Sequence, residues 1–320
     1  MKEYSFLFFM LGSFTGIYYH AVMNAIVSTL CGLDFHFLSV FDKTIVKKDG
    51  KIIVSKRPFK LFQCITVFEK KGASVMYMSL VQFAVMAVEF MLALTGMVGI
   101  CLLPFSNIKL DLIYFMAGIM FFVVQFFIVD SASMLFKNRS IDGYTRYIIK
   151  KLQADADINS LDITLSKAET LKKPDKLLNL FYVLCFYKML YNNEINEMAP
   201  LMAKIEKYLT SKTLSPLQKE TTLYAMAQYC CLPETAAIEE NKDKAAAWFS
   251  KWANTAKKPY DSAEYRLAAY YNYFIKADVQ QAKKYLDLAQ DSRPSYAGTL
   301  FETELNDMMI KRLKKILDNL

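Results

Sequence analysis

Three long stretches with little or no formal charge constrain this chain most strongly. The first runs over residues 4–33, the second holds Glu89 as its one formal charge, and the third begins near residue 112. A helix needs about 20 apolar residues to cross the hydrocarbon core of a membrane. We therefore predict three membrane-spanning helices, at about 5–32, 74–103 and 112–134.

Composition and charge agree with a membrane part followed by a second domain. Of the 320 residues, 54% are hydrophobic, and the formal net charge is +8. Residues 1–155 carry +6 and residues 156–320 carry +2, so the positive charge accompanies the apolar stretches, which favours membrane orientation over nucleic-acid binding. Six cysteines without metal-ligand or paired secretory spacing indicate reduced, buried thiols. We exclude collagen-like, disordered and disulfide-scaffold proteins, and we expect no nucleic-acid partner.

The basic residues around the spans predict an orientation. Nine follow the first span and five follow the third, whereas the link between the second and third spans holds only Lys109. Because cytoplasmic loops carry the excess of lysine and arginine, we expect a multi-pass protein of the cell membrane with its N-terminus outside and its C-terminal domain in the cytoplasm. A signal peptide is the competing interpretation of the first stretch, which is long for one and lacks a convincing cleavage site.

The segment between the first two spans has the pattern of a β-hairpin. Residues 35–62 alternate apolar and polar side chains around Asp49-Gly50, and Asp-Gly between such segments is a strong hairpin signal. Seven basic residues in this segment would meet anionic head groups. We predict a small β-ribbon at the membrane surface, with membrane lipid as a partner.

From about residue 159 onward the sequence predicts amphipathic helices. Six prolines punctuate this region at intervals of roughly 16 to 35 residues. The stretch 282–289 before Pro294 is typical of the second helix of a tetratricopeptide-type repeat. The fold class is therefore an all-α membrane protein with three spans, a surface hairpin and a C-terminal tetratricopeptide-like α-solenoid. We expect a membrane domain over 1–155 and a cytoplasmic helical-repeat domain over 156–320.

A histidine inside the first span is the clearest candidate for function. His20 lies just past the middle of the span, and Asn24 follows four residues later, so both side chains point the same way. An ionisable group at this depth is costly unless it faces protein or water. His20 therefore belongs to a functional site, such as a metal site, or it is a neutral histidine that bonds to a neighbouring helix.

Two further intramembrane acids have simpler interpretations. For Glu89 in the second span we expect a hydrogen bond to a polar group of the third span such as Gln125, with a substrate or gating contact as the alternative. For Asp130, at the inner end of the third span, we expect an interfacial anchor.

An Asp-Gly pair follows the third span at Asp142 and Gly143. Such a pair commonly marks a turn or a helix cap. In the predicted topology, however, Asp142 returns to the cytoplasmic side, on which His20 also lies. The two side chains would then be able to share a metal.

The order of these features resembles the site-2 protease family of intramembrane zinc metallopeptidases. Those enzymes carry His-Glu-x-x-His on one transmembrane helix, a membrane-associated β-ribbon shortly afterwards, and Asp-Gly after a later span. Here the matching segments are 20–24, the ribbon opening at Asp34, and Asp142-Gly143, and the resemblance covers roughly 5–152. It implies a zinc cofactor, peptide hydrolysis, and a membrane-associated peptide or precursor as substrate.

Two positions that are essential in the family differ in this chain. The resemblance implies that His20 and Asp142 are the first and third zinc ligands, while Ala21 occupies the place of the general-base glutamate and Asn24 that of the second histidine. Zinc needs three protein ligands and an open water position, and the glutamate takes a proton from that water. His36, in a predicted strand, cannot substitute. We expect weak or absent zinc binding and no catalysis.

Three functions are compatible with the sequence. The resemblance predicts an intramembrane zinc metallopeptidase, inactivated at the base and second-ligand positions by engineering or by natural change. The alternative is a non-catalytic pseudoprotease or membrane adaptor that binds a peptide or protein partner through its helical-repeat domain. A transporter accessory subunit, suggested by the polar residues within the spans, is the third.

Overall fold

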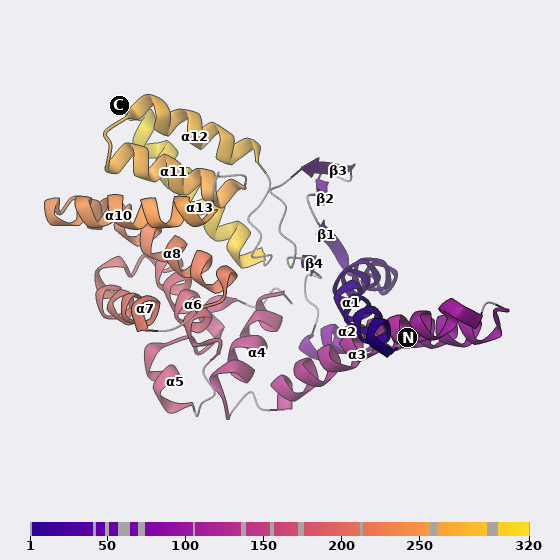
Figure 1. The fold of residues 1–320 in the computed structure, drawn as a ribbon. Helices are drawn as coiled ribbons and strands as arrows, with labels where there is room; N and C mark the ends of the chain where they lie inside the picture. Colours follow the sequence, from indigo (N-terminus) through magenta and orange to yellow (C-terminus); the bar gives the residue numbers. More distant parts are fainter. Residues whose placement is uncertain are drawn as a thin grey trace. The chain divides into compact units, whose positions relative to one another are not determined.

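The computed structural model divides the chain into two compact units, Met1–Leu135 with Gln153–Asp155, and Phe136–Leu152 with Ala156–Leu320. We call them the membrane unit and the helical unit and describe each by itself (Figure 1). The structure describes residues 2–319 apart from the ranges 41–42, 49–50, 57–64, 70–73, 105, 136–138, 154–156, 172–175, 212–213, 257–260 and 293–299.

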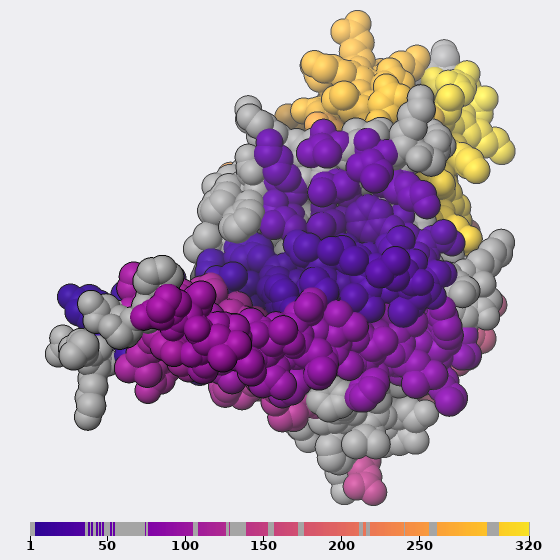
Figure 2. All heavy atoms as spheres, turned by 90° about the vertical axis from the view of Figure 1, so that its right-hand side faces the viewer, coloured from indigo at the N-terminus to yellow at the C-terminus, as the bar shows by residue number. Residues whose placement is uncertain are grey.

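Three long apolar helices form most of the membrane unit. They are α1 (Lys2–Leu30), α2 (Val75–Leu102) and α3 (Ser106–Leu135). Each contains a segment long and apolar enough to cross a membrane. The three predicted spans are therefore confirmed in their length and composition. Most exposed large apolar side chains of the described residues lie on these helices, whose surfaces run from indigo to magenta in Figure 2.

Glycine brings α1 and α3 into close contact. A Cβ atom on Gly118 would lie 2.7 Å from the backbone nitrogen of Ser13 and closer still to the carbonyl oxygen of Phe9. Gly12 of α1 faces the backbone of Phe115 in the same way. Small residues that let helix backbones approach are typical of packing inside membranes. The two glycines therefore fix where α1 crosses α3.

Four short strands separate α1 from α2 along the chain. They are β1 (Asp34–Val40), β2 (Lys43–Lys48), β3 (Lys51–Lys56) and β4 (Ile65–Glu69), and they form an antiparallel sheet in the order β3-β2-β1-β4.

The sheet is larger than the predicted two-stranded ribbon. The turn expected at Asp49-Gly50 lies outside the described residues, and β4 lies beyond the predicted end at residue 62. Because β4 pairs with β1, some thirty residues earlier, the hairpin signal at Asp49-Gly50 carries no information about it. Attachment of the sheet to a membrane surface stays a prediction.

The helical unit contains short and long helices that pack against their neighbours along the chain. Prominent neighbours are α6 with α7, α8 with α10, and α11 with α12. The α-solenoid arrangement stays a prediction. The described elements are α4 (Ile141–Gln153), η1 (Ile158–Ser160), α5 (Leu165–Thr170), α6 (Leu178–Tyr191), η2 (Ile195–Glu197), α7 (Ala199–Ser211), α8 (Pro216–Cys230), α9 (Pro233–Ala236), α10 (Glu239–Ala256), α11 (Ser262–Phe274), α12 (Val279–Asp291) and α13 (Leu300–Asp318).

Local sequence signals explain where several of these helices begin. Ser215 and Gln218 form a capping box at the start of α8, with Pro216 as the first helical residue. Asp261 and Asp278 accept backbone hydrogen bonds at the starts of α11 and α12. These caps satisfy N–H groups that have no partner within the helix.

Helix α4 belongs to the helical unit, although the sequence predicts it as part of the membrane domain. Ile141, Tyr144, Ile148 and Leu152 are buried in the apolar core of the helical unit. The spacing of these residues puts them on one face of α4. The first compact unit consists of Met1–Leu135 and Gln153–Asp155, and the domain boundary expected at residue 155 stays a prediction.

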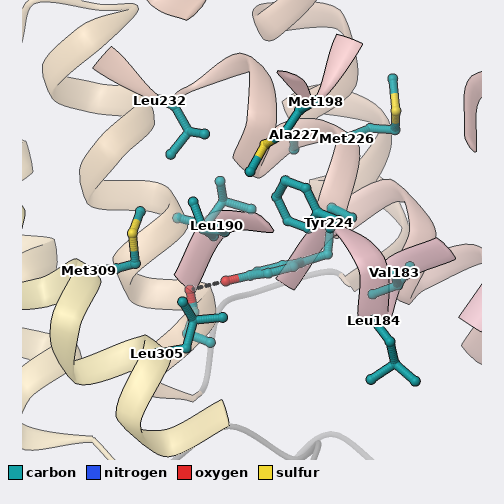
Figure 3. Close-up of a cluster of buried hydrophobic side chains, with 14 of the residues drawn as sticks. Val183, Leu184, Leu190, Met198, Tyr224, Met226, Ala227, Leu232, Leu305 and Met309 are labelled. Carbon is teal, nitrogen blue, oxygen red and sulfur yellow. Dashed lines mark hydrogen bonds between the residues drawn. The ribbon is translucent and has the colours of Figure 1, made fainter. Parts of the chain in front are cut away.

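One continuous apolar core holds the helical unit together. Figure 3 shows part of it, with Leu190 of α6, Tyr224 of α8 and Met309 of α13 among the labelled side chains. Burial of such residues removes apolar surface from water and is the main favourable contribution to folding. Because α13 contributes to this core, the last described helix is packed and not a free tail.

Candidate functional site

The side chains of His20 and Glu89 pair in the interior of the membrane unit. His20 Nδ1 lies 2.9 and 3.0 Å from the two carboxyl oxygens of Glu89. Glu89 is 0% exposed and His20 is 8% exposed. The hydroxyl of Tyr19 also donates to the backbone carbonyl of Glu89, at 3.1 Å. These contacts join the middle of α1 to α2.

The predicted hydrogen bond between Glu89 and the third span was wrong. We expected a polar group of the third span such as Gln125, but the carboxylate pairs with His20 of α1. Gln125 is exposed on α3. Between two helices of a membrane protein, an ionisable acid is stabilised best by a group able to donate to it, and His20 offers a ring nitrogen.

Asn24 lies one turn beyond His20 and joins a second set of polar contacts. Its Oδ1 accepts hydrogen bonds from Ser28 Oγ at 2.8 Å and from Gln82 Nε2 at 3.4 Å. His20, Asn24 and Ser28 are spaced by four residues, which places them on one face of α1. We call these three residues together with Gln82 and Glu89 of α2 the polar seam.

The residues present do not fit a zinc site of the family type. Ala21 is buried and its methyl group cannot take a proton. The carboxamide of Asn24 is neutral and already accepts from two side chains of the protein. Among the described residues, no group of three or more His, Cys, Asp or Glu side chains is arranged to hold a metal ion.

Asp142 lies in the first turn of α4, in the helical unit. Its Oδ1 accepts a hydrogen bond from the backbone nitrogen of Leu177, just before α6, at 2.8 Å. Ser140 Oγ accepts from Gly143 N at 3.1 Å and so caps the start of α4. These contacts give the Asp-Gly pair a structural role within the helical unit. A metal shared by Asp142 and His20 stays a prediction, because the two residues belong to different units.

His36 and Asp130 are two other polar residues that the sequence brings to attention. His36 lies in β1 and Asp130 lies in α3, but the side chains of both lie outside the described part of the structure. The expectation that Asp130 is an interfacial anchor therefore stays a prediction.

Sequence reasoning missed Gln82, Ser28 and Tyr19 as neighbours of the candidate site. A signal for the first two was present, because Ser28 continues the spacing of four from His20 and Asn24, and Gln82 precedes Glu89 by seven residues, about two helical turns. Tyr19 gave no such signal, since its hydroxyl bonds to a backbone oxygen.

The cysteines of the helical unit are buried and unreactive in character. Burial raises the pKa of Cys185 to about 12 and that of Cys230 to about 11, and it raises the pKa of Cys231 well above its ordinary value. The thiolate is the reactive form of cysteine. These thiols therefore offer no nucleophile near neutral pH.

Comparison with known proteins adds no identity to this geometry. No family model matches the chain, and no curated protein or solved structure matches it either. The resemblance to the site-2 protease family therefore rests on the residues themselves, and the function that it implies is a proposal.

Proposed function

We propose that this chain is a non-catalytic relative of the intramembrane zinc metallopeptidases that serves as a membrane adaptor. Helices α1 to α3 anchor it, and the helical unit binds a peptide or protein partner. The observation that carries the proposal is the buried pair of His20 and Glu89. Where the family places its first zinc ligand, this chain has a histidine that is bonded to another helix.

The chemistry of the neighbouring positions supports the same conclusion. Zinc-dependent hydrolysis needs three protein ligands, an open water position and a base that takes the proton of the water. Ala21 supplies no base, and Asn24 supplies a neutral amide engaged by Ser28 and Gln82. The polar seam is therefore suited to holding α1 against α2.

The orientation of the adaptor follows from the charges around the spans. The segments after the first and third spans carry most of the basic residues, so we place both on the cytoplasmic side, with anionic lipid as a contact. The helical unit then faces the cytoplasm. Its nearly balanced charge gives no electrostatic preference for a partner.

A second candidate is the metallopeptidase itself, in a form disabled at positions 21 and 24. The order of spans, strands and Asp-Gly along the chain favours it. In an intact enzyme a glutamate at position 21 would activate a zinc-bound water, and the substrate would be a membrane-associated peptide or precursor.

The zinc content of the purified full chain in detergent tests the proposal. We would compare the unchanged chain and its His20→Ala variant with an Ala21→Glu, Asn24→His double variant. Two further samples would add Asp142→Ala or Glu89→Gln to the double variant, and the second of these removes the carboxylate that pairs with His20. For the unchanged chain we expect a zinc content far below one ion per chain. The His20→Ala variant should contain the same small amount of zinc.

The outcomes test catalysis and descent separately. About one zinc per unchanged chain, lost in His20→Ala, would refute the non-catalytic proposal. Zinc that is bound by the double variant and lost with Asp142→Ala would support descent from the metallopeptidases. Absence of zinc from every variant would remove that descent and leave the membrane adaptor.

A further inference from the structure

Helix α13 contacts three parts of the helical unit that are distant in sequence. The ring of Phe301 packs edge-on against Tyr191 of α6, with the ring centroids 5.3 Å apart. Arg312 forms an ion pair with Glu234 of α9. Further contacts join α13 to α11 and α12. The side chains that meet α13 include Tyr191, Glu234, Ser262 and Tyr270. We call these residues, with the parts of α11 and α12 that contact α13, the α13-binding surface.

The residue pattern of α13 is that of an amphipathic helix docked by one face. Apolar residues recur every fourth position and are all buried, at Phe301, Leu305, Met309, Leu313 and Leu317. The exposed positions carry charged residues, namely Glu304, Asp307, Lys311, Lys314, Lys315 and Asp318. Separate peptides that bind as helices use the same pattern of apolar anchors. The α13-binding surface therefore has the properties of a receptor for an amphipathic helix.

Helix α11 carries a line of three polar side chains on one face, and in the described part of the structure α13 forms hydrogen bonds with only two of them. Ser262, Arg266 and Tyr270 are four residues apart, so they lie along one face of α11. The first accepts from Asn306 Nδ2 at 2.7 Å, and the hydroxyl of the third donates to the carbonyl of Met309 at 2.9 Å. Arg266 lies between them and is therefore on the side of α11 that α13 covers.

Arg266 is the least satisfied member of this line. It is 3% exposed, and its Nη2 donates to Tyr224 Oη at 2.8 Å. Within the described part of the chain, its Nε and Nη1 have no hydrogen-bond acceptor, and Asn306 Oδ1 on α13 has no donor. Buried polar groups are nearly always paired. Helix α13 thus fits the surface by its apolar residues, while Arg266, on the same face of α11 as Ser262 and Tyr270, keeps two nitrogen atoms without an acceptor among the described residues.

We propose that the α13-binding surface is the docking site for an amphipathic helix of a partner protein, and that α13 occupies this site until the partner displaces it. The partner helix carries an acidic side chain at the place of Asn306, where a carboxylate accepts from Arg266. This inference rests on the proposed adaptor function and names its binding site.

Two effects decide whether α13 or a partner helix occupies the surface. One is the covalent link of α13 to α12, and the other is the set of hydrogen bonds that α13 leaves unmade. Eight residues separate α12 from α13, and a short tether gives an effective concentration on the order of millimolar. A separate partner helix must therefore have a higher intrinsic affinity for the surface than α13 has in order to displace it. An unmet buried hydrogen-bonding group weakens an interface by roughly tenfold, and a carboxylate facing Arg266 forms a stronger, charge-assisted bond.

Hydrogen exchange of the full chain in detergent tests whether α13 detaches by itself. We expect peptides from residues 301–317 to exchange at least tenfold faster than those from α8 and α11. That result corresponds to an opening that leaves the rest of the helical unit folded. If α13 exchanges at the same rate as α8 and α11, it is an inseparable part of the core, and the proposal is overturned.

Binding in trans tests the surface and the chemistry of the partner. A labelled peptide of residues 300–319 would be added to a chain ending at residue 292, whose folding is checked by circular dichroism, and to the full chain. We expect saturable binding to the shortened chain and weaker binding to the full chain, because α13 competes. A Met309→Asp peptide should bind at least tenfold more weakly, and an Asn306→Asp peptide severalfold more tightly.

The outcomes separate this inference from the proposed function. A folded shortened chain that does not bind the native peptide refutes the docking site, and an Asn306→Asp peptide that binds no better refutes the acidic partner. If the shortened chain does not fold, hydrogen exchange of the full chain decides alone. The zinc measurements involve other residues, so their failure would leave these results unchanged.

Discussion

Replacing Gly118 by alanine should force α1 and α3 apart. The new Cβ atom would lie 2.7 Å from Ser13 N and closer still to Phe9 O, whereas ordinary contacts begin near 3.4 Å. Both neighbours are backbone atoms of a helix, so neither can rotate away as a side chain would. The helices must therefore separate by roughly 1 Å, which costs about 1–3 kcal/mol by analogy with overpacked cores.

The chain offers two matched controls for this steric argument. A Cβ atom on Gly99 meets nothing within 4 Å, and one on Gly96 meets only the flexible end of Met116, at 2.9 Å. Gly99→Ala should therefore be neutral or stabilising by up to about 1 kcal/mol, because alanine favours the helix. Gly96→Ala should lie between the other two variants.

Hydrogen exchange of α1 in detergent measures the separation directly. A cost of about 1–3 kcal/mol corresponds to a roughly 5- to 150-fold increase in local opening and hence in the exchange of amides on the contacting face. Equal exchange in Gly118→Ala and Gly99→Ala would refute the backbone contact between α1 and α3. Exchange of α11 in the helical unit should not change in either variant.

Two further predictions concern the helical unit, whose urea-induced unfolding is reported by its two tryptophans, both in α10. Asp142→Ala removes the acceptor for Leu177 N and should lower the free energy of unfolding by about 1 kcal/mol. Asp142→Asn retains an acceptor and should lower it by less. Equal losses of stability in the two variants would contradict the hydrogen-bonding role of Asp142. Burial raises the pKa of Tyr224 to about 12 and that of Cys230 to about 11, so the folded unit keeps protons that the unfolded chain releases above about pH 9 to 10. Because the unfolded state then binds fewer protons, stability falls as pH rises, and the urea midpoint should drop as the pH is raised from about 9 to about 11. A constant midpoint over this range would contradict the burial.

The three spans were predictable because their signal is local. An apolar stretch that lacks formal charge has few alternatives to a spanning helix, and α1, α2 and α3 lie close to the predicted ranges. The fourth strand was not predictable in this way. Its pairing with β1 joins residues far apart in sequence, from Ser39 with Ile65 to Asp34 with Glu69, and no local pattern specifies a partner at that distance.

The candidate site shows the same division between local and non-local information. The shared face of His20 and Asn24 follows from their spacing within one helix. The pairing of His20 with Glu89 depends on how α1 and α2 pack, which the sequence does not state. The apolar face of α4 likewise does not reveal from the sequence which core it will join.

The close crossing of α1 and α3 has a consequence for synthesis of the chain. Helix α1 packs more extensively on α3 than on α2, its neighbour in sequence. About one hundred residues separate the end of α1 from the end of α3, so at roughly 5–20 residues per second α1 is complete on the order of ten seconds before its main partner. Gly12 and Gly16 face Phe115 and Phe122 of α3 in the folded unit, so during that interval they present an unfilled helix face to lipid, to the insertion machinery or to another membrane helix with small residues. Assembly of the membrane unit is thereby limited by the arrival of the third span.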